Sequence, residues 1–260
     1  MNKWILLLSG LLMVGGVHAA DPAAEKGLEI VKEMDRRNSG WKDSQATLKM
    51  ILINKNGDKT VRRLRVKSLE VQNDGDKSLT IFDEPYDVKG TAFLSYSHVL
   101  KPDEQWLYLP ALKRIKRISS NNKSGPFMGS EFSYEDLASF EVEKYDYKYL
   151  GEDEIDGRKM FVVEMYPKYK HSGYTREVAW IDQQEYRMEK IDFYDRKNAL
   201  LKTLTFKNYK KYLGKFWRAL RMEMVNHQKG SKTILEWEDY KFNVGLTDDD
   251  FSRSVLKRAR

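Results

Sequence analysis

Few residues of this sequence have the types and spacing that catalysis or metal binding requires. After residue 20 the chain has three histidines, His98, His171 and His227, whose separation in sequence matches no metal-binding motif. It has no cysteine, so neither a disulfide nor a thiolate metal site can form. A glycine-framed nucleophilic serine, a phosphate-binding loop and a dinucleotide-binding fingerprint are also missing. We therefore expect no metal site and no cofactor.

A cluster of acidic residues at Glu131, Glu135 and Asp136 could supply the paired carboxylates that glycosidases use. Ser133 precedes Asp136 by three residues, however, and this spacing is typical of the start of a helix, where acidic side chains are stabilising. Since a helix start explains Glu135 and Asp136 without catalysis, the sequence favours a binding protein over an enzyme.

Residues 105–137, QWLYLPALKRIKRISSNNKSGPFMGSEFSYEDL, contain the most distinctive pattern of the chain. Trp106, Tyr108 and Leu109 belong to an alternating run that predicts a strand ending at Pro110. Four cations follow around two isoleucines, and they suit a half-exposed strand that meets an anionic surface: Lys113, Arg114, Lys116 and Arg117.

The run 119–125 is polar and ends in glycine, which predicts a mobile loop. Phe127 and Met128 come next, between Pro126 and Gly129. Large apolar side chains at a loop tip must pack either over a cavity of their own protein or against a partner.

The run WLYLPALKRIKRIS, followed by FMGSEFSYEDL, resembles the signature segment of the LolA-like outer-membrane lipoprotein-sorting proteins, in the branch associated with RND-type lipid exporters. The resemblance implies a periplasmic carrier that holds acyl chains in an apolar cavity. It also implies the fold: a strongly curved, unclosed antiparallel half-barrel with a few short helices over its concave face. Many relatives at the outer membrane are lipoproteins, whereas this chain has no cysteine for acylation.

On this resemblance, residues 119–129 would form a lid whose Phe127 and Met128 close the mouth of the cavity. The other expected lid or lipid-binding residues are Trp106, Tyr108, Leu109, Phe132 and Tyr134. The four cations named above would dock on lipid phosphates or on acidic loops of an inner-membrane transporter, unless they form only a solvated strand face. Expected partners are lipid or lipoprotein acyl chains, an inner-membrane RND-type transporter and an outer-membrane acceptor, and the free protein is expected to be a monomer.

Residues 1–20 predict a secretory signal peptide, because Lys3 precedes an apolar run and the small residues Ala19 and Ala20 offer alternative cleavage points. No later stretch is long and apolar enough to span a bilayer. We therefore expect residues 21–260 to form a single soluble periplasmic domain that is not a lipoprotein. The net charge of +7 favours anionic lipid headgroups or an acidic partner over nucleic acid, although plain solubility explains it equally well.

The pattern of apolar residues predicts a mainly antiparallel β protein. Asp21-Pro22 begins a predicted helix that ends near 38–40, and from Trp41 onward the apolar residues largely alternate. Turn signals such as Asn56-Gly57 and Asp156-Gly157 divide the rest into roughly ten to thirteen strands. Further helices are expected from Ser133 and over about 248–257.

One face of this sheet is predicted to be rich in aromatic residues and methionine. Three short helices cannot fill the concavity of so large a sheet, so a cavity is expected; a filled sandwich or a closed barrel is the alternative. Two other functions remain open, a lipid-sensing periplasmic regulator and an accessory subunit of a membrane transporter that carries no cargo. The sequence does not identify the cargo lipid or the acceptor protein.

Overall fold

The computed structural model describes residues 21–258, so the predicted signal peptide lies outside the described residues. The predicted first helix is confirmed as α1 (Pro22–Asn38). Its start follows from the sequence, because the Asp21 carboxylate accepts a hydrogen bond of 3.0 Å from the Ala23 amide and Pro22 occupies the first turn. Arg36 and Arg37 in the last turn complement the helix dipole.

The remaining regular structure is a set of thirteen strands within residues 21–258. In chain order they are β1 (Asp43–Ile53), β2 (Lys59–Leu69), β3 (Lys77–Glu84), β4 (Ala92–Tyr96), β5 (Glu104–Leu109), β6 (Arg114–Ile118), β7 (Tyr145–Ile155), β8 (Arg158–Pro167), β9 (Tyr174–Asp182), β10 (Met188–Asp195), β11 (Leu200–Tyr212), β12 (Phe216–Asn226) and β13 (Ser231–Phe242). Short 3-10 turns connect them: η1 (Pro110–Leu112), η2 (Ser120–Asn122), η3 (Phe127–Gly129), η4 (Glu135–Leu137), η5 (Val142–Lys144), η6 (Asp248–Phe251) and η7 (Val255–Lys257).

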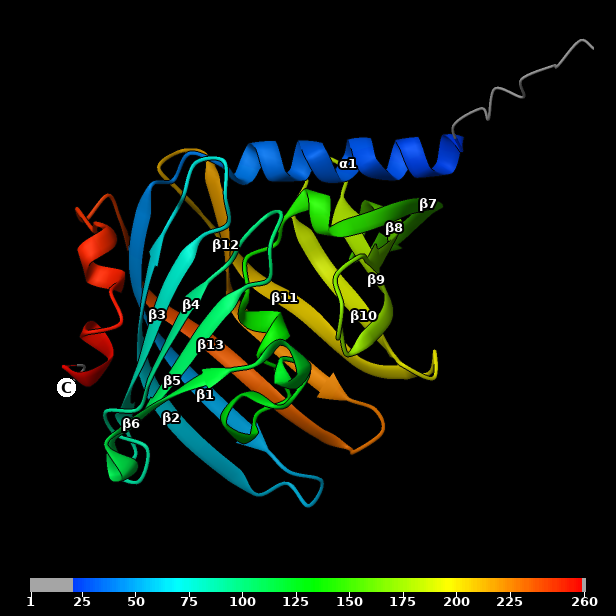
Figure 1. Ribbon diagram of the computed structural model, residues 1–260. Helices are drawn as coiled ribbons and strands as arrows, with labels where there is room; N and C mark the ends of the chain where they lie inside the picture. The colour runs from blue at the N-terminus through cyan, green and yellow to red at the C-terminus, as the bar shows by residue number, and fades with distance from the viewer. Residues whose placement is uncertain (1–20, 259–260) are drawn as a thin grey trace, which may run out of the picture.

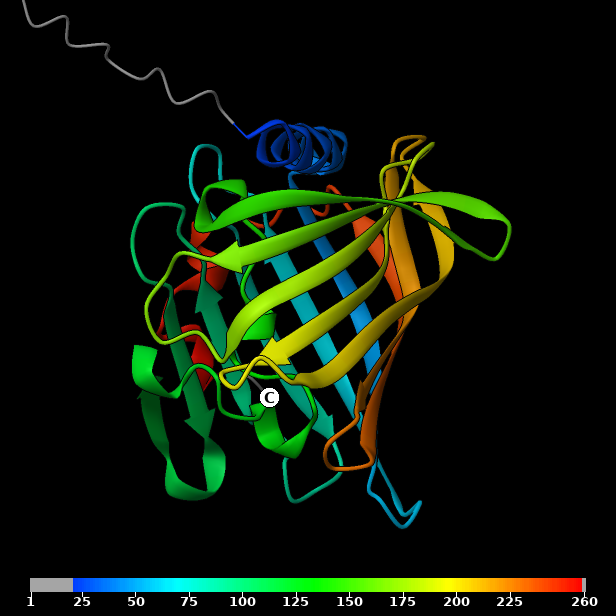
Figure 2. The same ribbon diagram turned by 90° about the vertical axis from the view of Figure 1, so that its right-hand side faces the viewer.

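All thirteen strands form one antiparallel sheet in the order β6-β5-β4-β3-β2-β1-β13-β12-β11-β10-β9-β8-β7. Strands that follow one another in the chain are paired, except β6 and β7. The first strand, β1, also pairs with the last, β13, at the centre of the sheet. The edges β6 and β7 do not pair with each other, so the sheet is unclosed and curves around a concave face (Figure 2). The predicted half-barrel is confirmed, and a closed barrel or a two-sheet sandwich is not formed.

The helix α1 lies across one end of the curved sheet and packs mainly against β7 (Figure 1). Ile30 and Val31 are its fully buried residues on that side. Gly27 allows the close approach, because a Cβ atom there would lie 3.0 Å from the Tyr149 amide nitrogen.

The C-terminal segment differs from the prediction. Instead of a helix over the concave face, it forms the 3-10 turns η6 and η7 on the opposite, convex face (Figure 1). Phe251 and Leu256 are completely buried there against β3, β4 and β5. The physical reason is that Leu79, Ile81 and Leu94 leave a second apolar patch on the convex side that needs cover.

Candidate lipid-binding site

The two faces of the sheet carry separate apolar clusters. The larger one lies on the concave face and draws buried side chains from most strands, including Met50, Leu64, Phe93, Met165 and Met224. The second lies on the convex face under the C-terminal segment. Because side chains alternate along each strand, neighbouring residues of one strand belong to different clusters.

The segment 119–144, which connects β6 to β7, crosses the concave face and supplies part of the larger cluster. We call residues 119–144 the covering segment. Its Phe127 is 1% exposed and contacts the rings of Phe82, Phe93 and Tyr134 at centroid distances of 5.9, 5.1 and 5.6 Å. Phe132 and Leu137 add to the same packing. The covering segment therefore fills much of the space in which an acyl chain would lie.

Polar contacts, and not strand pairing, hold the covering segment in place. Its one β-bridge among the described residues is internal, between Pro126 and Ser133. The Met128 carbonyl accepts a hydrogen bond of 2.6 Å from Arg62 of β2. Met128 itself has φ 50°, a left-handed conformation that costs energy in a residue with a side chain. A strained tip held by side-chain contacts can detach more readily than a hydrogen-bonded strand.

Glu131 is the first of three carboxylates that anchor the covering segment. It accepts hydrogen bonds from the Asn226 amide at 2.7 Å and from the Ser231 hydroxyl at 2.6 Å. The Glu131 backbone amide donates to the Thr233 hydroxyl at 2.9 Å. These contacts join the segment to β12, β13 and the turn between them.

Asp136 and Glu135 anchor the segment to the neighbouring strands of the same half of the sheet, β11 and β9, and to the turn before β9. Asp136 pairs with Lys202 of β11 at 2.6 Å and accepts a hydrogen bond from the Tyr174 hydroxyl at 2.6 Å. Glu135 accepts hydrogen bonds from the Tyr169 and Ser172 hydroxyls and from the Gly173 amide. All three carboxylates of the acidic cluster thus bind groups of their own chain. The predicted helix start at Ser133 is confirmed only as the single 3-10 turn η4.

Glu177 of β9 is an ionisable residue buried among apolar side chains of the concave face. It lies opposite Phe193 of β10 and Met165 of β8 in the sheet and is 6% exposed. Burial, with Asp136 and Glu135 nearby, raises its pKa well above the usual value. Burial therefore favours the protonated, uncharged form of the Glu177 side chain.

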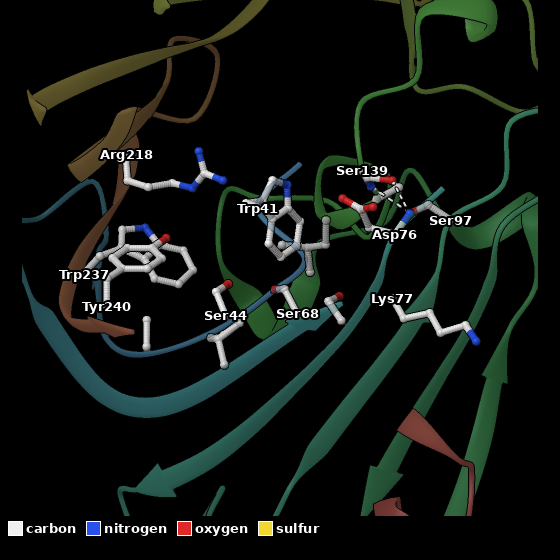
Figure 3. A pocket seen from close by; sticks show the side chains of 15 residues that line it. Trp41, Ser44, Ser68, Asp76, Lys77, Ser97, Ser139, Arg218, Trp237 and Tyr240 are labelled. Atoms are coloured by element: carbon white, nitrogen blue, oxygen red, sulfur yellow. Dashed lines mark hydrogen bonds between the residues drawn. The ribbon is translucent and has the colours of Figure 1, made fainter. Parts of the chain in front are cut away.

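Two cavities remain beside the covering segment. The Lys202 cavity, about 330 Å³, lies between the covering segment and the ends of β10, β11 and β12; its lining includes Pro126, Tyr174, Arg196, Leu201 and Lys202. The Arg218 cavity, about 210 Å³, lies on the other side of the segment and is lined partly by Trp41, Val66, Leu137, Arg218 and Trp237 (Figure 3). Ligand pockets in proteins usually measure roughly 300–1,000 Å³, so these cavities are small for a diacyl lipid.

Residues 21–258 contain neither a group of metal-holding side chains nor a helix that could span a membrane. No group of three His, Asp or Glu side chains is placed to hold a metal ion in that range. None of its helices has the length and hydropathy to cross a membrane.

Comparison with known structures decides the family. A domain assigned to outer membrane lipoprotein sorting, from Vibrio parahaemolyticus, is 59% identical with a TM-score of 0.89, covering 90% of this chain and 100% of that one. A DUF1329 family protein from Desulfovibrio piger is 31% identical with a TM-score of 0.85, covering 90% and 99%. A LolA superfamily protein from Nitrosomonas europaea, 22% identical over 90% and 99%, shares the fold with a TM-score of 0.71.

This chain belongs to the family of the outer membrane lipoprotein-sorting domain and the DUF1329 protein, and it has the LolA fold. A family model described as "Uncharacterized protein" also matches residues 74–258. No curated protein matches the sequence. The LolA-like resemblance of residues 105–137 is therefore confirmed at the level of the family.

Five of the predicted lipid-binding or lid residues lie in the concave-face cluster of this LolA-like protein. Phe127 and Phe132 are buried in it, and Leu109, Met128 and Tyr134 pack against it. The structure thus brings the residues of the predicted lid together with the end of β5. The segment that crosses the concave face is longer than the predicted lid of residues 119–129 and continues to residue 144.

Trp106 and Tyr108 lie elsewhere. Both project from β5 to the convex face, where Trp106 is 6% exposed in the cluster of Phe251 and Leu256. Tyr108 packs against the same cluster. The alternation of β5 places Leu107 and Leu109 on the concave side instead, so we leave Trp106 and Tyr108 out of the proposed lipid-binding set.

The four predicted docking cations are all exposed on the edge strand β6 and the turn before it. Lys113 has φ 47° at the tip, next to the exposed Leu112, and Arg114 and Lys116 follow. Arg117 makes a contact of 3.4 Å with Glu104 of the neighbouring strand. The tip therefore presents three cations beside an exposed leucine.

Sequence reasoning missed Lys202, Glu177 and Arg218. For Glu177 a signal existed, because it is in phase with Ala179 and Ile181, both fully buried. The same signal existed for the other two, because Lys202 is in phase with Leu204 and Phe206, and Arg218 with Leu220 and Met222.

Proposed function

We propose that this protein is a periplasmic carrier, and not an enzyme, that holds the acyl chains of a lipid or lipoprotein against the concave face of its sheet. In this proposal it takes its cargo from an inner-membrane RND-type exporter and moves it toward the outer membrane. The observation that carries the proposal is the covering segment, a non-strand connection that completes the concave apolar cluster and is anchored by side-chain contacts.

On binding, the acyl chains of the cargo would replace the covering segment as the apolar surface that packs against the sheet. Displacing the covering segment exposes Phe127, Phe132 and Tyr134, and acyl chains would take their place against the sheet. Burial of acyl methylenes contributes about 0.8 kcal/mol each, so one long chain can offset both the lost packing and several broken hydrogen bonds. The small volumes of the two cavities support a closed, unloaded state.

Transfer requires partners at both ends of the route, because apolar contact alone would retain the cargo. The exposed cations Lys113, Arg114 and Lys116 are the proposed docking surface for the exporter or for the membrane around it. The protein would act as a monomer in the periplasm after removal of residues 1–20. A regulator that senses lipid could use the same pocket, but it would not move cargo between membranes.

Lipid extracted from gently purified protein and identified by mass spectrometry tests the proposal. Two variants on β1 give a matched pair: Leu52→Glu places a carboxylate against the concave cluster, and Ile53→Glu places one beside Lys59 and Lys232. We expect lipid with wild-type protein and with Ile53→Glu, and much less with Leu52→Glu. Wild-type protein that contains no lipid, and takes up none from vesicles, would rule out the carrier.

A further inference from the structure

The Arg218 cavity is polar on one side and continuous with the concave apolar cluster on the other. Val66, Leu137 and Trp237 belong both to its lining and to that cluster. In Figure 3, Ser44 and Ser68 lie on the floor of the cavity while Arg218 reaches over it from β12. An amphiphile could therefore place its polar end here without leaving the concave face.

Arg218 brings a cation to this cavity, and the nearest carboxyls that act on it, Asp76 and Glu70, do so without a direct ion pair. Its guanidinium donates to the Asn38 side-chain oxygen at 2.7 Å and to the Trp217 carbonyl at 2.9 Å, both through Nη1. It also lies 5.8 Å from the ring of Trp41. Within residues 21–258 no acidic side chain forms an ion pair with it, and burial lowers its pKa. A partly buried cation in this state favours an anion as its partner.

Other donors point to the same kind of ligand. The indole Nε1 of Trp237 is buried and has no hydrogen-bond partner among the described residues. The hydroxyls of Ser44 and Ser68 also line the cavity. The carboxyl in the wall, Asp76, has a pKa of about 7 because of burial, so it is protonated in a large share of molecules near neutral pH.

Lys77 does not add to this set. Although it contributes to the lining, its amino group pairs with Asp248 at 2.6 Å on the convex side and points away from the cavity in Figure 3. The donors that remain come from β1, β2, β12 and β13 and approach from several directions. Such an arrangement suits a tetrahedral oxyanion better than a planar one.

We propose that the Arg218 cavity binds the phosphate headgroup of an anionic lipid whose acyl chains lie along the concave face. This inference rests on the proposed carrier function and favours an anionic lipid over a lipoprotein as the cargo. The acylated cysteine of a lipoprotein is neutral and offers Arg218 no anionic group. The cavity of about 210 Å³ has room for one phosphate with part of a glycerol.

Isothermal titration calorimetry with two lipids of the same acyl chain tests the inference: 1-palmitoyl lysophosphatidylglycerol and 1-palmitoylglycerol. We expect wild-type protein to bind the phospholipid about ten-fold or more tightly than the neutral lipid. Arg218→Gln should remove that difference by weakening binding of the phospholipid. Arg221→Gln is the control, since it removes the same charge from β12 at a residue that pairs with Glu236 at 2.5 Å.

Trp237→Phe keeps an aromatic ring and removes the Nε1 donor, so it tests the cavity even if Arg218→Gln fails to fold; it should weaken binding of the phospholipid only. Equal binding of the two lipids by wild-type protein would overturn the headgroup site and leave the carrier intact. Binding of neither lipid would contradict the carrier itself. Inorganic phosphate that binds as tightly as the phospholipid, with the same dependence on Arg218, would show a site for free anions and overturn the lipid assignment.

Discussion

Asp76 shows how strongly its surroundings change a single side chain in this protein. Burial is the main cause that raises its pKa from 3.8 to about 7, and the nearby carboxylates of Glu141, Glu70 and Asp35 act in the same direction. The Val71 amide, which donates to Asp76 at 3.2 Å, only partly offsets these effects. The folded protein therefore holds a proton that the unfolded chain releases near pH 4.

This difference predicts the sign of a pH effect. Between about pH 4 and 7 the folded state binds more protons at Asp76 than the unfolded state, so the contribution of Asp76 to stability falls as the pH rises. Asp76→Asn removes the titration and keeps an acceptor for the Val71 amide. We expect the variant to gain on the order of 1–2 kcal/mol over wild type at pH 8, and less at pH 5.

Urea denaturation at pH 5 and pH 8 measures this difference. A free energy of unfolding that differs from wild type by the same amount at both pH values would contradict the buried, protonated Asp76. Asp58→Asn, in the exposed turn between β1 and β2, is the control for the loss of a carboxylate that is not buried.

At the scale of elements, side-chain contacts anchor the covering segment to the sheet, and a covalent link at one of them should keep it closed. The Glu131 amide lies 2.9 Å from the Thr233 hydroxyl, so a disulfide between cysteines at these two positions would tie the covering segment to β13. The chain has no other cysteine to compete. We expect the oxidised Glu131→Cys/Thr233→Cys protein to take up lipid from vesicles at least about ten-fold more slowly than its reduced form.

The reduced double variant is its own control, and Thr233→Cys alone should respond to neither oxidant nor reductant. Rapid uptake by the fully oxidised protein would show that lipid binds without movement of the covering segment at Glu131. Mass spectrometry after alkylation establishes how complete the oxidation is.

The sequence predicted the strands of this sheet well, because apolar residues alternate along them and turns such as Asn56-Gly57 are specific. It also predicted that Phe127 and Met128 would be sheltered. It did not predict which face of β5 points toward the concave side. Both faces of this strand are apolar or amphipathic, so hydrophobicity does not distinguish the face with Trp106 and Tyr108 from the face with Leu107 and Leu109. That choice depends on the C-terminal segment, which supplies Phe251 and Leu256 from the far end of the chain.

The charged tip of β6 acts at the scale of the whole molecule. Lys113, Arg114 and Lys116 are exposed, and each cation near an anionic membrane contributes about 1 kcal/mol. Replacing all three with glutamine should therefore weaken binding to phosphatidylglycerol vesicles about 100-fold at low salt, and added salt should reduce the effect. Vesicle co-sedimentation measures the affinity.

A second triple variant removes the same charge elsewhere. Lys207, Lys210 and Lys211 are exposed on β11, and their replacement with glutamine should change vesicle binding by no more than about two-fold. Equal losses from the two triple variants would mean that net charge alone governs the interaction and that the tip is no docking surface.

The pairing of β1 with β13 has a consequence for how the molecule is assembled. Ile51 and Ile234 face each other in the middle of the sheet although about 180 residues separate them along the chain. Until the last strand forms, β1 and β12 each present an unsatisfied edge, and these edges invite association with other chains. The strands β1–β6 and β7–β12 therefore form two separate parts of the sheet until β13 pairs with both β1 and β12 and joins them.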